Sequence, residues 1–220
     1  MNVKLNLYKK KDLNYFSNIR KEIYSLLPKN CHNVLDLGCG NGATLGWIKD
    51  LKVCNKTYGV DIVQPGPDTH KNIDQYLNKD LEECDYFFEN TKFDLILILD
   101  VLEHLVDPDN FIKKVRNSLN DDGIIILCIP NIRHYSILKN IFIEGDFPYN
   151  ETGILDKTHL RFFTNKSIKR FLNNHNLFIK ETLKYPIDFP SKSRILNLLT
   201  AGFFSEFFTQ QYILKIQLNE

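Results

Sequence analysis

The sequence lacks a strong excess of charge, paired cysteines and any hydrophobic run long enough to cross a membrane. Its 28 basic and 27 acidic residues leave a formal net charge of +1, so the chain lacks the basic footprint of most nucleic-acid-binding proteins. Its most apolar stretch near the end, from Ile195 to Phe208, is interrupted by polar residues, which a membrane span would exclude. Neither a nucleic-acid partner nor a transmembrane segment is expected.

The five cysteines form no C-x-x-C pair, and their number is odd. This argues against a disulfide scaffold and a cysteine zinc site, and fits a reducing cytoplasm, the expected location. The basic start, Met1 to Lys11, has no apolar segment behind it, so a secretory leader is not expected. With 220 residues, 43% of them hydrophobic, the chain is predicted to form one α/β domain over residues 1–220.

A glycine-rich loop organises the rest of the chain. A short apolar run from Asn33 to Leu37 is followed by glycines at positions 38, 40 and 42, and then by a helical pattern that starts at Ala43. This order predicts a buried strand, a tight turn and a helix start. Glycines allow positive φ and close approach of a ligand, and a helix start offers unpaired N–H groups. The loop therefore predicts a site for a nucleotide-type ligand.

The carboxylate of Asp36, two residues before the first glycine, helps to decide which ligand. An anion there would repel a pyrophosphate and favour an ammonium or sulfonium group. The string Leu35 to Gly42 resembles motif I of the class I S-adenosylmethionine-dependent methyltransferases. Two alternatives remain open: an NAD-dependent oxidoreductase on a similar sheet, and a non-catalytic cofactor-binding protein.

A second stretch, from Phe93 to His104, resembles a signature of small-molecule O-methyltransferases such as those of ubiquinone biosynthesis. Residues 93–99 form the most apolar run in the chain, as expected for a central parallel strand covered on both faces. His104 has the residue type for removing a hydroxyl proton near neutral pH. It is equally able to orient the loop by hydrogen bonding.

The resemblance implies a Rossmann-like fold: a mostly parallel seven-stranded sheet with a C-terminal antiparallel hairpin and helices on both faces. It also implies the cofactor S-adenosylmethionine, with S-adenosylhomocysteine as product. Asp61 ends a predicted strand about 20 residues after the glycine loop, where a carboxylate accepts hydrogen bonds from a ribose diol. The expected cofactor-binding residues are Asp36, Gly38, Gly40, Asp61, Ile62, Asp80, Leu81, Asp100 and, from an N-terminal helical lid over residues 1–30, Tyr15.

A predicted insertion at residues 131–164 lies where such folds carry substrate lids. Within it, Leu155 to Thr164 resembles a segment of methyltransferases associated with bacterial cell-surface polysaccharide synthesis. This makes His159 and Arg161 candidate catalytic residues beside His104. The alternative is structural: the two side chains pin the loop, and Thr164 caps a helix over residues 165–174.

These observations predict O-methylation of a sugar hydroxyl in a polysaccharide precursor, with a small aromatic or quinone-like acceptor as the alternative. Methyl transfer from a sulfonium needs alignment of the acceptor and loss of its proton. No metal is required by this scheme, and no ligand cluster has convincing sequence spacing. The expected partner is a small-molecule or glycan substrate, and a homodimer is possible.

Overall fold

The computed structural model describes residues 18–64, 66, 69–185, 202 and 204–218. The apolar spacing of residues 12–27 and 195–208 predicts a helix in each range. Tyr15, the first part of the former range and most of the latter lie outside the described residues. Within them, residues Lys21–Leu26 form a 3-10 helix, η2, where a regular α-helix was expected. Ser205–Phe207 form another short 3-10 turn, η5.

A single seven-stranded sheet forms the centre of the molecule, in the order β3-β2-β1-β4-β5-β7-β6. Strands β1 to β5 are parallel, while β7 runs antiparallel to both β5 and β6. The predicted sheet with its antiparallel ending is confirmed. The strands are β1 (Cys31–Leu37), β2 (Cys54–Asp61), β3 (Gln75–Asn78), β4 (Phe93–Leu99), β5 (Leu119–Pro130), β6 (Leu177–Tyr185) and β7 (Gln211–Leu218).

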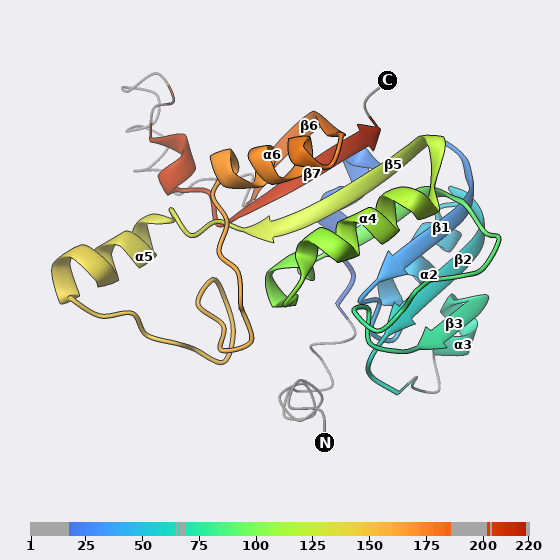
Figure 1. Ribbon diagram of the computed structural model, residues 1–220, viewed down its shortest axis with the longest axis horizontal. Helices are drawn as coiled ribbons and strands as arrows, with labels where there is room; N and C mark the ends of the chain where they lie inside the picture. Colours follow the sequence, from blue (N-terminus) through green and yellow to red (C-terminus); the bar gives the residue numbers. More distant parts are fainter. Residues whose placement is uncertain (1–17, 65, 67–68, 186–201, 203, 219–220) are drawn as a thin grey trace.

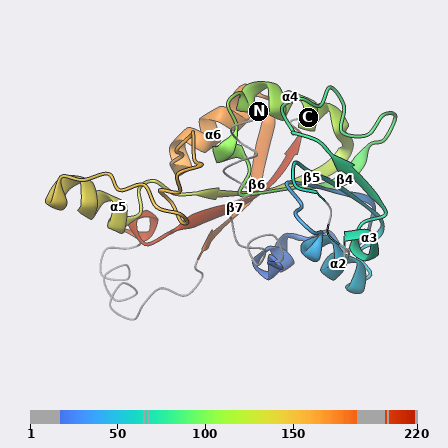
Figure 2. The ribbon, with the colours of Figure 1, turned by 90° about the horizontal axis from the view of Figure 1, so that it is seen from below.

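Helices cover both faces of this sheet. Helices α4 (Pro108–Ser118) and α6 (Asn165–Asn174) pack on one face, and α2 (Ala43–Asp50) and α3 (Thr69–Asn72) lie on the other (Figures 1 and 2). The central strand β4 shows why its sequence is continuously apolar. Ile96 and Ile98 join the core beneath α4 and α6, whereas Leu95 and Leu97 join the core on the η2 and α2 side.

One strand, β5, departs in extent from what its sequence predicts. The polar residues Asn120 to Gly123 end the preceding helix in the sequence pattern, which predicts a strand that starts at Gly123. The strand instead begins at Leu119, which pairs with Phe93 across a register shift. Both side chains are almost completely buried, so their burial extends the strand over a polar segment that reads as a turn. The crossover helix after β2, by contrast, agrees with its sequence: two prolines and a glycine between Val63 and His70 predict a short helix, and α3 has only four residues.

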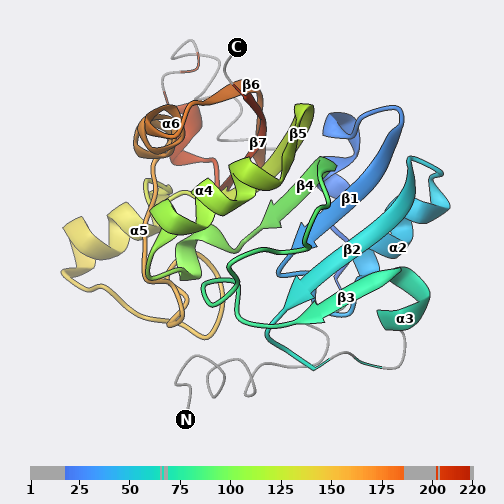
Figure 3. The same ribbon diagram turned by 45° about the vertical axis from the view of Figure 1, so that its right-hand side comes forward.

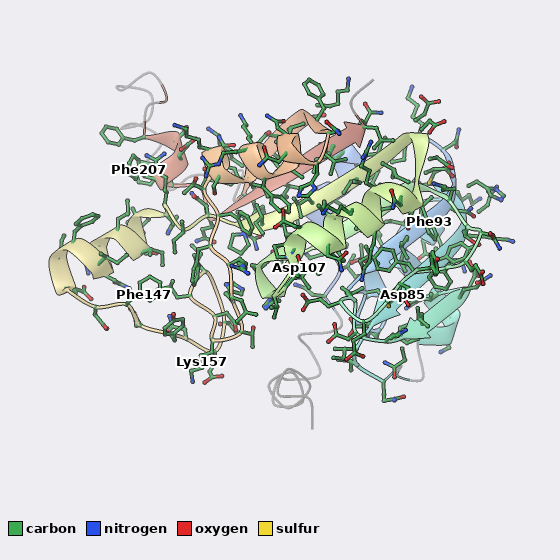
Figure 4. The ribbon with its side chains drawn as sticks, viewed as in Figure 1. Asp85, Phe93, Asp107, Phe147, Lys157 and Phe207 are labelled. Carbon is green, nitrogen blue, oxygen red and sulfur yellow. The ribbon has the colours of Figure 1, made fainter. Side chains whose placement is uncertain are left out.

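Residues 131–164 leave the carboxyl end of β5 and form an arm that extends beyond the sheet (Figure 1). The arm contains α5 (Tyr135–Lys139) and a π-helical turn, η4 (Asn140–Glu144). Figure 4 shows Phe147 and Lys157 on this arm, far from Phe93 within the sheet. The arm returns to α6, whose predicted cap at Thr164 forms a complete capping box with Ser167. Among the described residues, no helix has the length and apolar character needed to span a bilayer.

Substitution of Gly42 by alanine is expected to lower the free energy of unfolding by ~3 kcal/mol. Gly42 has φ +78°, and an added Cβ would lie 2.5 Å from Cγ1 of the buried Ile73. Gly145→Ala is a matched control, because Gly145 has φ +67° and open space around it, so only the backbone strain of ~1 kcal/mol applies. Urea unfolding measures both values, and equal losses would contradict the predicted clash.

Candidate functional site

A pocket of about 280 Å³ opens at the carboxyl ends of β1, β2 and β4, the edge at which open α/β sheets bind ligands. Figure 3 shows these three strands side by side with their ends at one edge. We call this cavity the large pocket. Its lining consists of Asn18, Arg20, Asp36, Gly38, Cys39, Gly40, Thr44, Asp61, Ile62, Asp80, Leu81, Leu99, Asp100, Val101, His104 and Leu105.

The glycine loop adopts the conformation that its sequence predicts. Gly38, Gly40 and Gly42 all have positive φ, which side chains with a Cβ rarely adopt. A Cβ on Gly38 would also lie 2.7 Å from Cγ2 of Val101. Both the backbone conformation and the lack of space therefore require glycine at this position. The backbone of the loop therefore forms one wall of the large pocket without side chains in the way.

Asp61, at the end of β2, connects the second strand to the glycine loop. Its Oδ2 accepts a hydrogen bond from the Gly40 N–H at 2.7 Å, and its Oδ1 accepts one from the Val63 N–H at 2.9 Å. Each carboxylate oxygen keeps a second lone pair for a ligand. Burial raises the pKa of Asp61, although these backbone donors oppose the shift. The side chain is thus fixed in place at the pocket wall.

The large pocket has an acidic lining. Asp36, Asp61, Asp80 and Asp100 contribute carboxyl groups, and the guanidinium of Arg20 opposes them. Burial and the neighbouring Asp61 raise the pKa of Asp36 to about 7, with Arg20 acting in the opposite direction. A cationic ligand stabilises the ionised carboxylates, whereas a pyrophosphate is repelled.

Asp100 is held in a defined orientation between the first and last parts of the chain. Its Oδ2 forms an ion pair with Nη1 of Arg20, and its Oδ1 accepts a hydrogen bond from Nε2 of Gln211 at 2.8 Å. Asp100 itself has φ +57°, a conformation that asparagine and aspartate tolerate better than most residues. Arg20 also brings the N-terminal segment across the large pocket, where its N–H donates to Oγ1 of Thr44.

A second cavity, the small pocket, adjoins the first and shares Asp100 and His104 with it. It lies between the end of β5, the start of β7 and the returning part of the arm. Most of its lining side chains are polar. The lining residues are Asp100, Glu103, His104, Pro130, Thr152, Gly153, Ile154, Asp156, His159, Gln210 and Gln211.

Glu103, His104 and His159 meet on one wall of the small pocket. Each has one ligand-type atom within 4.8 Å of those of the others, and all three residues are buried. Nε2 of His159 lies 3.9 Å from Oε1 of Glu103, and the two imidazole centroids are 4.7 Å apart. The backbone oxygen of Glu103 accepts bonds from the N–H groups of Leu160 and Arg161, which fixes the arm against the β4 loop.

Burial raises the pKa of the Glu103 carboxyl well above its usual range, and nearby Asp100 adds to the shift. Glu103 as a whole is 1% exposed. Within the described part of the chain, neither of its oxygens accepts a hydrogen bond. A buried carboxyl group without donors is costly, so this side chain calls for an explanation beyond loop stability.

The structure brings together most of the residues that the sequence singled out. All of the expected cofactor-binding residues within the described ranges line the large pocket, and Tyr15 lies outside them. His104 lines both pockets and His159 lines the small one. Arg161 lies elsewhere: it is exposed, lines neither pocket, and its Nη2 donates to the Val106 carbonyl at 2.6 Å.

Several residues of the site carry no clear signal in the sequence. Gln211 enters because its strand pairs with β5, which places Gln211 opposite Pro130. Asn18 and Thr44 line the large pocket through the packing of the N-terminal segment on α2. The position of Glu103 next to His104 in the sequence indicated that it lies near the site. Its lack of hydrogen-bond donors depends on tertiary packing and could not be predicted.

Comparison with known proteins gives a family. Residues 9–181 match the model of the family described as a methyltransferase domain. A ubiquinone biosynthesis O-methyltransferase of Glaesserella parasuis is 29% identical over 108 residues, covering 44% of this chain and 45% of that protein. The mitochondrial enzyme of the same name from Dictyostelium discoideum is 24% identical over 170 residues, 70% of this chain and 52% of its own. The matches thus span about half the length of these curated relatives.

Solved structures show the same fold. An S-adenosylmethionine-dependent methyltransferase described as putative, from Listeria monocytogenes, superposes with a TM-score of 0.61 at 18% identity, covering 90% of this chain and 97% of that one. The 1,6-didemethyltoxoflavin-N1-methyltransferase of Burkholderia thailandensis, solved with S-adenosylhomocysteine, superposes with a TM-score of 0.60 at 14% identity over 98% and 82% of the two chains.

The glycine loop, the acidic large pocket and the strand order agree with the family match, which covers most of the chain. The family resemblance seen in the sequence is confirmed by this match. The chain belongs to the methyltransferase domain family, and it has the fold of the solved methyltransferases to which it is similar.

Proposed function

We propose that this protein transfers the methyl group of S-adenosylmethionine to a sugar hydroxyl of a cell-surface polysaccharide precursor. The observation that carries the proposal is the polar small pocket, which meets the large pocket at Asp100 and His104. A second substrate at this junction lies next to the methyl donor. The proposed arrangement is one domain over residues 1–220, with residues 1–30 and 131–164 as lids.

Each part of S-adenosylmethionine can be assigned to a group of residues that line the large pocket. The homocysteine part fits beside Gly38 and Gly40, where the backbone leaves room, and the positive charges of the ligand favour the neighbouring carboxylates. The ribose hydroxyls fit as donors to Asp61. Ile62 and Leu81 supply apolar surface for the adenine, and Asp80 lies beside them in the lining.

Methyl transfer is an in-line displacement. The acceptor oxygen bonds to the methyl carbon while the carbon–sulfur bond breaks and its electron pair stays on sulfur. Positioning supplies most of the acceleration, and the hydroxyl proton must be lost. His104 is the proposed proton acceptor, because its Nδ1 donates to the Thr158 carbonyl at 3.0 Å, which leaves Nε2 as the basic nitrogen. His159 is the other candidate base.

The lining of the small pocket favours a sugar over an aromatic ring. Carboxylates, histidines and glutamines outnumber the apolar Pro130 and Ile154, and hydroxyl-rich ligands need many polar partners, whereas a flat ring needs apolar walls. The polysaccharide assignment also draws on the likeness of Leu155 to Thr164 to polysaccharide-associated methyltransferases. In the structure this segment supplies Asp156 and His159 to the pocket.

A quinone-like or small aromatic acceptor is the second candidate. It is favoured by the curated relatives, which include ubiquinone biosynthesis O-methyltransferases. The exposed apolar side chains of the arm, among them Phe142 and Ile143, are compatible with an acceptor that carries an apolar tail.

Transfer of labelled methyl to acceptor panels separates the two candidates. The purified protein is incubated with [methyl-¹⁴C]S-adenosylmethionine and, in parallel, with nucleotide-activated sugars, surface oligosaccharides, catechols and quinols. We expect label in a sugar as a base-stable methyl ether. Label only in catechols or quinols would replace the first candidate with the second.

The affinity for S-adenosylmethionine is expected to rise ~10-fold in total between pH 6 and pH 8, with most of the rise below pH 7. In the free protein the pKa of Asp36 is about 7, and a bound cation stabilises its ionised form. Below pH 7 the ligand must therefore displace a proton from Asp36, which weakens binding. Calorimetric titration gives the affinity of the wild type and of Asp36→Asn at each pH. Protonation of the ligand's own amino group affects both proteins equally, so it cancels in the ratio of the two affinities. Identical pH profiles would contradict the role of Asp36.

A further inference from the structure

We propose that Glu103, His104 and His159 bind a divalent transition-metal ion of the zinc class at the wall of the small pocket. The three ligand-type atoms converge within 4.8 Å although two elements far apart in the sequence supply them. Glu103 and His104 lie in η3 (Leu102–His104), directly after β4, and His159 comes from the returning arm. The proposal departs from the metal-free scheme expected from the sequence, in which this convergence was not visible.

Both histidines present the nitrogen that a metal ion needs. Nδ1 of His104 donates to the Thr158 carbonyl at 3.0 Å, and Nδ1 of His159 donates to the Ile154 carbonyl at 2.9 Å. A carbonyl accepts only from a protonated nitrogen, so each neutral ring carries its lone pair on Nε2. A backbone carbonyl on the far nitrogen is the usual outer contact of a metal-binding histidine, because it fixes the tautomer and the ring orientation.

Glu103 supplies the second, independent observation. Its carboxyl group is buried, and neither oxygen has a hydrogen-bond partner among the described residues. Nε2 of His159, 3.9 Å from Oε1, is beyond hydrogen-bond distance. Coordination of a cation satisfies such oxygens directly and offsets the cost of burying them.

The donor set indicates the class of ion. Two imidazole nitrogens and one carboxylate suit Zn²⁺ and similar first-row ions, whereas Mg²⁺ and Ca²⁺ prefer oxygen donors throughout. Bonds of ~2.1 Å place tetrahedral ligands ~3.4 Å apart, so the three side chains close on the ion by about 1 Å. Three protein ligands leave a position open, as in catalytic zinc sites.

The use of the ion rests on the proposed function. The cluster lines the small pocket, so the open position faces the proposed acceptor. A hydroxyl bound to such an ion loses its proton to solvent more readily, and its oxygen then attacks the methyl carbon. The ion would also bring one oxygen of a vicinal diol into line with the cofactor. In this scheme His104 acts on the hydroxyl through the metal ion.

Metal binding is tested on the full-length, tag-free protein after treatment with a chelator. Titration with Co²⁺, followed by its visible absorption, and with Zn²⁺ by calorimetry is expected to show one equivalent bound. We expect Glu103→Gln and His159→Gln each to weaken metal binding at least ~100-fold. Changes to residues that only contact a metal ligand weaken binding by ~10- to 100-fold, and loss of a ligand itself should weaken it at least as much. His134→Gln is the matched control, because His134 is buried and bonds to Ser136 outside the cluster.

Each variant is also titrated with S-adenosylhomocysteine, because Glu103 and His159 do not line the large pocket. Retained binding shows that the variant is folded. Failure of the wild type to bind zinc while it binds S-adenosylhomocysteine would overturn the proposal, as would equal zinc affinity in all variants or a thiolate-to-cobalt charge-transfer band. Zinc binding without methyl transfer to any sugar would count against the proposed function alone.

Discussion

Replacement of His104 by glutamine is expected to lower kcat by ~10²- to 10⁴-fold, the range in which a positioned acid–base group contributes. His104 lies where the two pockets meet, and we propose that it acts on the acceptor hydroxyl, either as the base or as a metal ligand. Both roles concern the transition state more than the binding of the cofactor. Initial rates under saturating S-adenosylmethionine, with S-adenosylhomocysteine affinity measured in parallel, separate the two effects.

The control for this substitution is His134→Gln. His134 is also buried but caps α5 through its contact with Ser136, away from both pockets. We expect its kcat to stay within about threefold of the wild type, because a lost cap changes stability by only ~1 kcal/mol. Equal kcat for His104→Gln and the wild type would remove His104 from the reaction.

Replacement of Asp61 by alanine is expected to weaken S-adenosylhomocysteine binding at least ~100-fold. The variant loses the carboxylate that we propose accepts the ribose hydroxyls, and each hydrogen bond to a charged group contributes ~1.5 to 3 kcal/mol. In the wild type the Gly40 N–H donates to Asp61 at 2.7 Å, and the substitution removes this acceptor as well. Calorimetric titration gives the dissociation constant directly.

Asp94→Ala is the matched control for Asp61→Ala. Asp94 also accepts backbone N–H groups, from His32 and Asn33, but it lies at the start of β4, the opposite edge of the sheet from the large pocket. We expect lower stability in Asp94→Ala with unchanged affinity for S-adenosylhomocysteine. Similar losses of affinity in both variants would show that Asp61 acts through stability and not through ribose contact.

The sheet was predictable because its signals are local. The apolar runs of β1, β4 and β5 need burial on both faces, and the glycine loop fixes the direction in which α2 leaves β1. The start of β5 was not predictable, since Leu119 joins the strand only through its pairing with Phe93. Likewise, the 3-10 form of η2 reflects packing of Ile23 and Leu26 into the core, which periodicity alone does not reveal.

The large pocket was predictable for a similar reason: ligand residues follow directly after parallel strands, and such strand ends meet at one edge of the sheet. The small pocket is different. It is assembled from the β4 loop, the arm and the start of β7, and only long-range contacts place Gln211 beside Asp100 or His159 beside Glu103. Arg161, next to these residues in sequence, points to the Val106 carbonyl instead.

A crystal structure of the protein with S-adenosylhomocysteine tests the central claim most directly. The account predicts the ligand in the large pocket, with its homocysteine beside Gly38 and Gly40, its ribose hydroxyls on Asp61, and its sulfur facing the small pocket next to His104. A ligand whose ribose lies away from Asp61, or whose sulfur faces away from His104, would contradict it.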